Sequence, residues 1–286
     1  MSYAYYPGCS LHSSAKDYDQ SIKALCNILG IQLQEIDDWN CCGATAAPSV
    51  NPDLALTLVL RNLARAEANH EKLVTACNAC YLALRRAKER IDQYPQLKAK
   101  MEDNLEAAGL EYQGRVTVQH LLEVVASLEP GVLAKQIKKP LTGLKVACYY
   151  GCQLVRPRFY DDPEDPRSLD WLMELTGAQV VPFRHKAKCC AASLATTKDM
   201  VAWKMIKDIL QDAQQEGAQL IVTICPMCQM NLDAYQDRIN ARFNLNLELP
   251  VVYFTQLLGL AFGLDSRNLG LDKPVVSPRR VLSSFL

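Results

Sequence analysis

The sequence contains the same five-cysteine pattern twice. In the first copy, Cys9 is followed after 31 residues by the adjacent pair Cys41-Cys42, and 34 residues further on by a Cys-x-x-Cys motif. The second copy has the same order, with 36 and 34 intervening residues. The ten cysteines of the two sets are Cys9, Cys41, Cys42, Cys77 and Cys80, then Cys152, Cys189, Cys190, Cys225 and Cys228. This repeat predicts two halves that fold alike, each of which brings five thiols to one place.

The repeat extends beyond the cysteines. The segment YYPGCSL at residues 5–11 corresponds to YYGCQL at residues 149–154. Proline and glycine residues around 130–143 favour a connecting segment between the halves. We therefore predict two homologous domains that arose by internal duplication, covering residues 1–135 and 143–286.

Strand and helix patterns alternate along each half. Short apolar runs at residues 145–149, 179–182 and 220–224 are typical of buried strands, and residues 54–69 and 200–215 have apolar positions at helical spacing. This alternation predicts the α/β class, with a small parallel sheet flanked by helices in each domain. Each cysteine element would then lie at the carboxyl end of a strand, where sites in open α/β sheets are usually found.

Composition and charge limit the function and the compartment. Lys plus Arg equals Asp plus Glu at 31 each, which argues against nucleic-acid binding, and the basic pair Arg85-Arg86 is expected on a solvated helix face. The N-terminus lacks the features of a secretory signal, and the longest apolar stretch, residues 251–264, is too short to cross a bilayer. We expect a cytoplasmic protein without a transmembrane segment. Thiols stay reduced in that compartment, so the ordered spacings favour metal binding over disulfides.

Several kinds of thiol site fit the pattern in part. Thiolates bind zinc, copper(I) or iron–sulfur clusters, but a structural zinc site commonly uses two Cys-x-x-Cys pairs, and each half has one. Adjacent cysteines point in different directions, which suits two neighbouring irons of one cluster. A fifth cysteine favours a larger or distorted cluster, or a spare reactive thiol. A thioredoxin-like pair would leave Cys9 and Cys41-Cys42 without a role. Cys26 and Cys148 lie outside the pattern and are expected to be buried apolar residues.

These motifs, YYPGC…CCG…CxxC and YYGC…CCA…CxxC, resemble the paired CCG domains of the B-type subunit of heterodisulfide reductase over nearly the whole chain. The resemblance implies that each five-cysteine set holds one noncubane [4Fe-4S] cluster. The second motif departs from the family by having Ala191 where glycine is usual, and glycine would allow a positive φ or a close approach of the backbone. Because all five cysteines of that set are present, we still expect a second cluster.

The resemblance implies the catalytic iron–sulfur subunit of a heterodisulfide-reductase-like complex in sulfur metabolism. This oxidoreductase would cleave or form a disulfide or persulfide bond between its two clusters. The sequence has no GxGxxG or Walker A motif and no further ferredoxin-like cysteine runs, so a flavin subunit (A-type) and a ferredoxin-type iron–sulfur subunit (C-type) are implied as partners. His185, Lys186 and Arg156 are candidates for substrate contact, against the more ordinary role of a surface or cluster-screening charge.

Two other functions stay open on the sequence. The motifs fit equally well a quinone-linked electron-transfer subunit of a succinate dehydrogenase or fumarate reductase, peripheral to the membrane. In that case residues 251–263 would form either an amphipathic helix touching the membrane or a helix packed on the sheet. The third alternative is a non-enzymatic scaffold that holds zinc.

Overall fold

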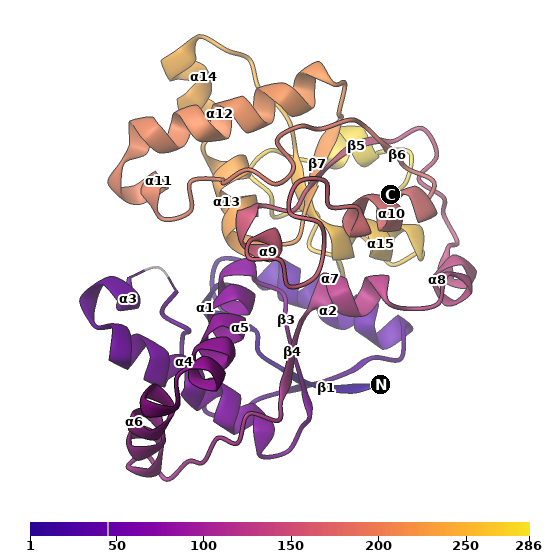
Figure 1. Cartoon of the computed structure of the whole chain (residues 1–286). Coiled ribbons are helices and arrows are strands. Elements are labelled where there is room, and N and C mark those ends of the chain that lie inside the picture. Colours follow the sequence, from indigo (N-terminus) through magenta and orange to yellow (C-terminus); the bar gives the residue numbers. More distant parts are fainter. Residues whose placement is uncertain (45) are drawn as a thin grey trace.

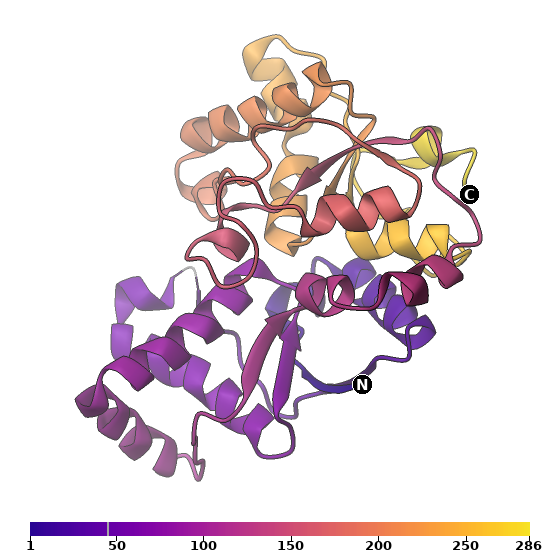
Figure 2. The ribbon, with the colours of Figure 1, turned by 45° about the vertical axis from the view of Figure 1, so that its right-hand side comes forward.

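The computed structural model describes residues 1–44 and 46–286, in which each half of the chain forms its own four-stranded parallel sheet (Figures 1 and 2). The strands of the first half are β1 (Ser2–Tyr5), β2 (Gln32–Glu35), β3 (Lys72–Thr75) and β4 (Thr117–His120). Its helices are α1 (Gly8–Leu11), α2 (Lys16–Ile28), α3 (Ala47–Val50), α4 (Pro52–Glu67), α5 (Asn78–Gln93), α6 (Pro95–Glu106) and α7 (Leu121–Ala126).

Helix α8 (Pro130–Gln136) connects this half to a second one with the same order of elements. The strands of the second half are β5 (Lys145–Tyr149), β6 (Gln179–Val180), β7 (Leu220–Thr223) and β8 (Val251–Tyr253). Its helices are α9 (Cys152–Val155), α10 (Ser168–Leu175), α11 (Leu194–Thr197), α12 (Asp199–Gln215), α13 (Pro226–Ala234), α14 (Gln236–Phe243), α15 (Phe254–Ala261) and α16 (Arg279–Leu282). The expected α/β fold with two duplicated parallel sheets is confirmed.

Both sheets have the same strand order. The first is arranged β2-β1-β3-β4 and the second β6-β5-β7-β8, and every pairing is parallel. The chain therefore reverses its direction of winding between β1 and β3, and again between β5 and β7. Loops diverge at such a switch point and leave space outside the carboxyl ends of the strands. The first and fourth cysteines of each set follow the two strands that flank this point.

Local signals account for the long helices. Helix α4 begins at Pro52, whose missing N–H is no loss at a first helical position. The side chain of Asn51 caps it by accepting hydrogen bonds from the N–H groups of Asp53 and Leu54, both at 3.0 Å. Helix α12 has the same place in the second half, and both bury an apolar stripe against their sheets.

The two halves pack with an approximate internal two-fold symmetry. Helix α2 contacts α15 while its counterpart α10 contacts α7, and α5 contacts α9 while α1 contacts α13. Every contact between the halves in this set thus occurs together with its symmetry-related counterpart, as in a symmetric dimer. Across the junction the Tyr18 hydroxyl donates to the Ile224 carbonyl oxygen at 3.0 Å, and the Ser21 and Thr255 hydroxyls lie 2.7 Å apart. One continuous apolar core spans both halves.

Residues 251–263 form β8 and α15, and the whole of α15 is buried. The helix packs against α2 and α10 at the junction between the halves. This segment therefore packs inside the protein and does not offer a face to a membrane. None of the helices in residues 1–44 and 46–286 combines the length and apolar character needed to cross a bilayer. The proposed domain limits, 1–135 and 143–286, stay a prediction.

Candidate functional site

The fold brings all ten patterned cysteines to the carboxyl ends of the strands. Cys9 lies in α1 directly after β1, and Cys77 directly follows β3 as the N-cap residue of α5. Cys152 and Cys225 have the same positions after β5 and β7. The adjacent pairs lie in the loops that follow β2 and β6. Strand direction alone thus gathers residues that are far apart in the sequence.

The adjacent cysteines of each set face different partners. In the first half the Cys41 sulfur lies 3.6 Å from that of Cys9, whereas the Cys42 sulfur lies 3.4 Å from that of Cys80. The second half repeats this arrangement, and its Cys190 and Cys228 sulfurs are 3.5 Å apart. One neighbour of each adjacent pair therefore turns toward the cysteine after the first strand and the other toward the Cys-x-x-Cys motif.

The two sets meet at the junction between the halves. The thiols of Cys77 and Cys225 lie close enough to shift each other's pKa, and each also interacts with the second cysteine of its own Cys-x-x-Cys motif. A continuous row of buried thiols results. Its members, in order, are Cys42, Cys80, Cys77, Cys225, Cys228 and Cys190. The row joins the two cysteine sets through protein that water does not reach.

Hydrogen bonds favour the thiolate at one position of each adjacent pair. Those from Cys41 and Cys80 lower the pKa of Cys42, and one from Cys152 lowers the pKa of Cys189. The thiols that follow β3 and β7 also stand at helix N-termini, where the aligned backbone dipoles favour negative charge. By contrast, contact with neighbouring thiols and burial raise the pKa of Cys41, Cys77, Cys80, Cys152 and Cys228. Each set therefore places thiolate and thiol side by side, and the thiolate is the form that binds metal.

Glycine provides the space beside the sulfurs. Gly8 and Gly151 have φ of +70° and +69°, and a Cβ atom added to them would lie 2.9 Å from the Cys80 sulfur and 3.0 Å from the Cys228 sulfur. Only glycine avoids both the close contact and the strained backbone. A similar backbone occurs in the residue after each adjacent pair, since Gly43 has φ of +65° and Ala191 has φ of +71°. The alanine therefore keeps the backbone of the glycine and bears the strain.

Unpaired polar atoms surround the meeting point of the two sets. The Thr75 and Thr223 hydroxyls, the Asn78 Oδ1 atom and the His120 Nε2 atom are buried and have no hydrogen-bond partner among the described residues. A buried polar atom without a partner costs about 1–3 kcal/mol. His120 Nδ1 accepts from the Leu122 N–H at 3.1 Å, which leaves the proton on Nε2. Three of these atoms are thus donors that a sulfur-rich group could satisfy.

The thiols of each set are arranged to bind a cluster of several metal ions rather than a single ion. Across residues 1–44 and 46–286, no three His, Cys, Asp or Glu side chains are arranged around a single ion position. What the structure provides in each half is one close thiol pair beside the Cys-x-x-Cys motif and a second pair made by the cysteine after the first strand. Paired, separated thiols, glycine clearance and unpaired donors together suit an iron–sulfur group.

Cys26 and Cys148 lie apart from this arrangement. Their exposed fractions are 2% and 1%, as expected for small buried apolar residues. Burial raises the pKa of Cys26 to about 12, so this thiol stays protonated.

The three candidates for substrate contact each lie against a carboxylate. His185 Nδ1 lies 2.9 Å from Asp212, and Arg156 lies 2.7 Å from Glu164. Lys186 is buried, 3.0 Å from Asp170. These side chains are therefore engaged within the second half, and their contact with substrate stays a prediction.

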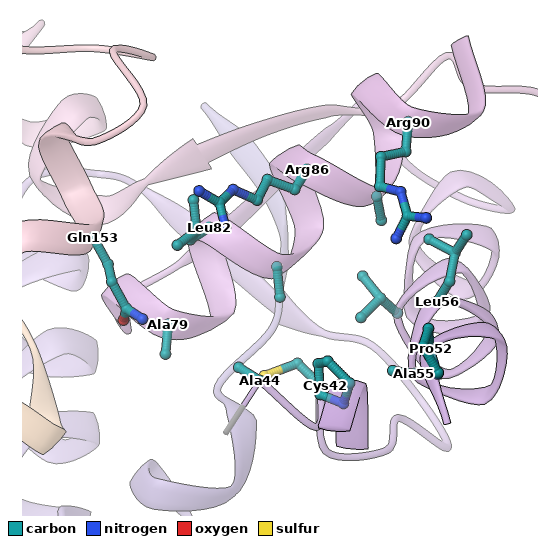
Figure 3. Close-up of a pocket in the computed structure, with 14 residues that line it drawn as sticks. Cys42, Ala44, Pro52, Ala55, Leu56, Ala79, Leu82, Arg86, Arg90 and Gln153 are labelled. Carbon is teal, nitrogen blue, oxygen red and sulfur yellow. The ribbon is translucent and has the colours of Figure 1, made fainter. Parts of the chain in front are cut away.

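Sequence reasoning missed a cavity that reaches the first cysteine set. This α4–α5 cavity has a volume of about 340 Å³ and lies between α4, α5 and the loop after β2; Figure 3 shows it with Cys42 below Arg86 and Arg90. Its lining residues are Cys42, Ala44, Pro48, Pro52, Ala55, Leu56, Val59, Ala79, Leu82, Ala83, Arg86, Ala87, Arg90 and Gln153. Arg86 is exposed, in keeping with the solvated helix face expected for it, but it also lines this cavity. Its i, i+4 spacing to Arg90, which places both on one helix face, is the sequence signal for this role.

Comparison with known proteins agrees with this geometry. The model of the CCG cysteine-rich domain matches residues 3–85 and 146–233. The chain belongs to this family. It is 36% identical over 98% of both chains to the 8-methylmenaquinol:fumarate reductase membrane anchor subunit of Wolinella succinogenes. It is also 30% identical to the B-type subunit of the Ferredoxin/F(420)H(2)-dependent CoB-CoM heterodisulfide reductase of Methanosarcina acetivorans, over 95% of this chain and 92% of the relative.

A solved structure shares the fold. A hypothetical protein from Helicobacter pylori superposes on 96% of this chain with a TM-score of 0.80 at 18% identity. The match covers 52% of that longer chain. The resemblance to the B-type subunit of heterodisulfide reductase, expected from the motifs, is thus confirmed, and this CCG-family chain is similar to named subunits of two kinds of oxidoreductase.

Proposed function

We propose that this chain is the iron–sulfur subunit of a multi-subunit oxidoreductase that cleaves or forms an S–S bond. Each five-cysteine set would hold one noncubane [4Fe-4S] cluster. The partners would be a flavin subunit together with a ferredoxin-type subunit. The observation that carries the proposal is the contact between Cys77 and Cys225, because the two five-cysteine sets then lie side by side in buried protein.

Two adjacent one-electron centres suit a two-electron conversion. Cleavage of a disulfide consumes two electrons and gives two thiolates, and each cluster, when bound, supplies one electron at a time. The protein's part is to hold the centres close, exclude water and stabilise the thiolate products. The buried row of thiols meets the first two needs. The guanidinium groups of Arg86 and Arg90, which line the same cavity as Cys42, meet the third, because they are positive at any working pH.

Anaerobic purification tests the proposal. We expect about eight iron atoms and about eight acid-labile sulfides per chain, as two four-iron clusters require. Electron paramagnetic resonance during stepwise oxidation and reduction should resolve two interacting centres. A colourless protein that contains zinc and no inorganic sulfide would overturn the proposal in favour of a metal-binding scaffold.

A quinone-linked function is the second candidate, and one comparison favours it. The relative at 36% identity is named as the membrane anchor subunit of a methylmenaquinol:fumarate reductase.

Activity of the isolated complex separates the two candidates. The first predicts reduction of organic disulfides by reduced ferredoxin or flavin, with no dependence on lipid. The second predicts oxidation of a menaquinol analogue coupled to fumarate reduction, together with sedimentation on liposomes. Disulfide turnover that persists when quinones are extracted would exclude the second candidate.

A further inference from the structure

The polar groups around the meeting point of the two cysteine sets differ between the halves. Asn78 is the first residue of α5, and Pro226 is the first residue of the corresponding helix α13. Proline has no N–H group and no polar side chain. His120 caps the helix after β4, whereas Tyr253 caps the corresponding helix after β8. The first half therefore offers an amide and an imidazole at positions where the second half offers neither.

The side chain of Asn78 reaches across the junction to the second set. It is buried, its Nδ2 atom donates to the Tyr150 carbonyl oxygen at 2.7 Å, and α5 packs on α9 (Figure 1). A Cβ atom added to Gly151 would lie 3.3 Å from Asn78 Nδ2 and 3.0 Å from the Cys228 sulfur. The amide and this sulfur thus border the same small space. An amide nitrogen carries two hydrogens, and the Tyr150 oxygen accepts one of them, so the other can point to a sulfur atom.

The corresponding space in the first half contains no amide. A Cβ atom added to Gly8 would lie 2.9 Å from the Cys80 sulfur, and its next neighbours are carbon atoms of the Tyr6 ring. Pro226 cannot donate a hydrogen bond there from its backbone or its side chain. The two halves therefore differ at a position where a substitution affects both of them.

The imidazole of His120 is a second donor near the second set. It is fully buried, its Nδ1 atom accepts from the Leu122 N–H, and its Nε2 atom has no partner among the described residues. Burial lowers the pKa of His120 and the charge of Cys225 acts against this, which places the imidazole near the second set. The corresponding Tyr253 ring is stacked on that of Tyr18 instead, with 3.8 Å between the ring centroids.

Donors on one side only make the two sites unequal as redox sites. A hydrogen bond to a sulfur atom raises the reduction potential of an iron–sulfur cluster, because the donor stabilises the negative charge that reduction adds. Buried protein strengthens this effect, since its effective dielectric constant is low.

We propose that Asn78 and His120 donate hydrogen bonds from the first half to sulfur atoms of the cluster held by the second set, which gives this second cluster the higher reduction potential. The inference rests on the proposed function, to which it adds the order in which the two clusters accept electrons. The first electron to enter the chain reduces the second cluster, and the next electron reduces the first cluster. Transfer of one electron from the first cluster to the second oxidises one and reduces the other, and it needs no proton.

A potentiometric titration of the anaerobically purified, intact chain, followed by electron paramagnetic resonance, tests the proposal. The wild type should show two midpoint potentials, and Cys228→Ser, which removes a cysteine of the second set, should abolish the higher one. Asn78→Pro, which copies the second half, should lower only the higher midpoint. The expected change is about tenfold in the equilibrium constant for reduction, which is about 59 mV for one electron. Proline fits this position because Asn78 is the first helical residue and Cys77 before it is extended, with φ −116° and ψ 122°.

The reverse exchange tests the other half. Pro226→Asn supplies the missing donor groups where α13 packs on α1, so it should raise the lower midpoint and leave the higher one unchanged. This variant gives a result even if Asn78→Pro does not fold. His120→Asn keeps a capping side chain but has no imidazole, and it should lower the higher midpoint. His70→Asn, just before β3 at the opposite edge of the first sheet, is its matched control and should change neither.

Equal midpoints in the wild type, or a higher midpoint that survives in Cys228→Ser, would overturn the proposal. Unchanged midpoints in both Asn78→Pro and His120→Asn would also overturn it. Iron and sulfide analysis of the same samples reports separately on the proposed function. A chain with about eight iron atoms and unshifted midpoints contradicts only this inference, whereas a chain without iron contradicts the proposed function as well.

Discussion

The two halves share their sheet and their sulfur positions, yet they differ around them. Both place a cysteine after the first strand, an adjacent pair after the second and a Cys-x-x-Cys motif after the third. The residue after the adjacent pair is Gly43 in one half and Ala191 in the other, and the residue that caps the helix after the last strand is His120 in one and Tyr253 in the other. Duplication therefore preserved the cysteine positions, while the surrounding residues diverged.

The approximate two-fold packing explains which residues could diverge between the two halves after the duplication. The main helix contacts between the halves occur in symmetry-related pairs, and the row of thiols crosses the symmetry axis at Cys77 and Cys225. Residues on that axis contact both halves, so a substitution there disturbs the packing of both. Residues away from it, such as those of the α4–α5 cavity, contact mainly one half and are free to specialise.

The largest effect should come from breaking one cysteine set at a time. Cys80→Ser should lower the iron content from about eight to about four atoms per chain and leave one centre visible by electron paramagnetic resonance. Cys228→Ser should do the same for the other half. Cys26→Ser, a buried cysteine outside the pattern, should keep all of the iron. If either ligand variant loses all of the iron, the two sites depend on each other and the halves do not act as equivalent units.

A second comparison, between the helix-capping residues His120 and Tyr253, concerns how the free energy of unfolding depends on pH. Burial lowers the pKa of His120 to about 4, whereas an unfolded histidine titrates near 6.5. Below pH 6.5 the unfolded chain therefore binds a proton that the native chain does not, and the free energy of unfolding falls as the pH falls. Between pH 6.5 and pH 5 this loss amounts to about 1.5 kcal/mol. Urea unfolding across this range should show it.

His120→Asn should remove this part of the pH dependence, because asparagine caps a helix but does not titrate. Tyr253→Phe should keep it, because burial raises the pKa of that tyrosine away from this range. Identical slopes for the wild type and His120→Asn would show that the histidine is protonated in the native protein.

A third comparison, of similar or smaller size, exchanges the residues after the adjacent cysteines. Gly43→Ala should lower the free energy of unfolding by between about 1 and 2 kcal/mol, because φ is positive and the new Cβ would lie 2.7 Å from that of Ala47. Ala191→Gly should raise it by less than about 1 kcal/mol, since relief of backbone strain is partly offset by a more flexible unfolded chain. Thermal unfolding measures both. A stabilised Gly43→Ala variant would contradict the shared backbone geometry.

The sequence by itself determined the duplication, the α/β class and the gathering of five thiols in each half. It could do so because strand periodicity and cysteine spacing are local properties, and parallel strands bring their carboxyl ends to one edge. It also indicated correctly that Cys26 and Cys148 would be buried. The different directions of Cys41 and Cys42 follow from their adjacency along an extended backbone.

Only the tertiary structure decided how the two sets meet. The contact between Cys77 and Cys225 depends on the packing of α2 on α15 and of α7 on α10, which no spacing encodes. The same packing buries residues 251–263, and the packing of α5 beside α4 places Arg86 at an apolar cavity. The pairing of His185, Lys186 and Arg156 with carboxylates likewise arises between separate elements. These four features depend on contacts between segments that are far apart in the sequence. The free energy of each contact depends on neighbouring side chains that come together only in the folded chain.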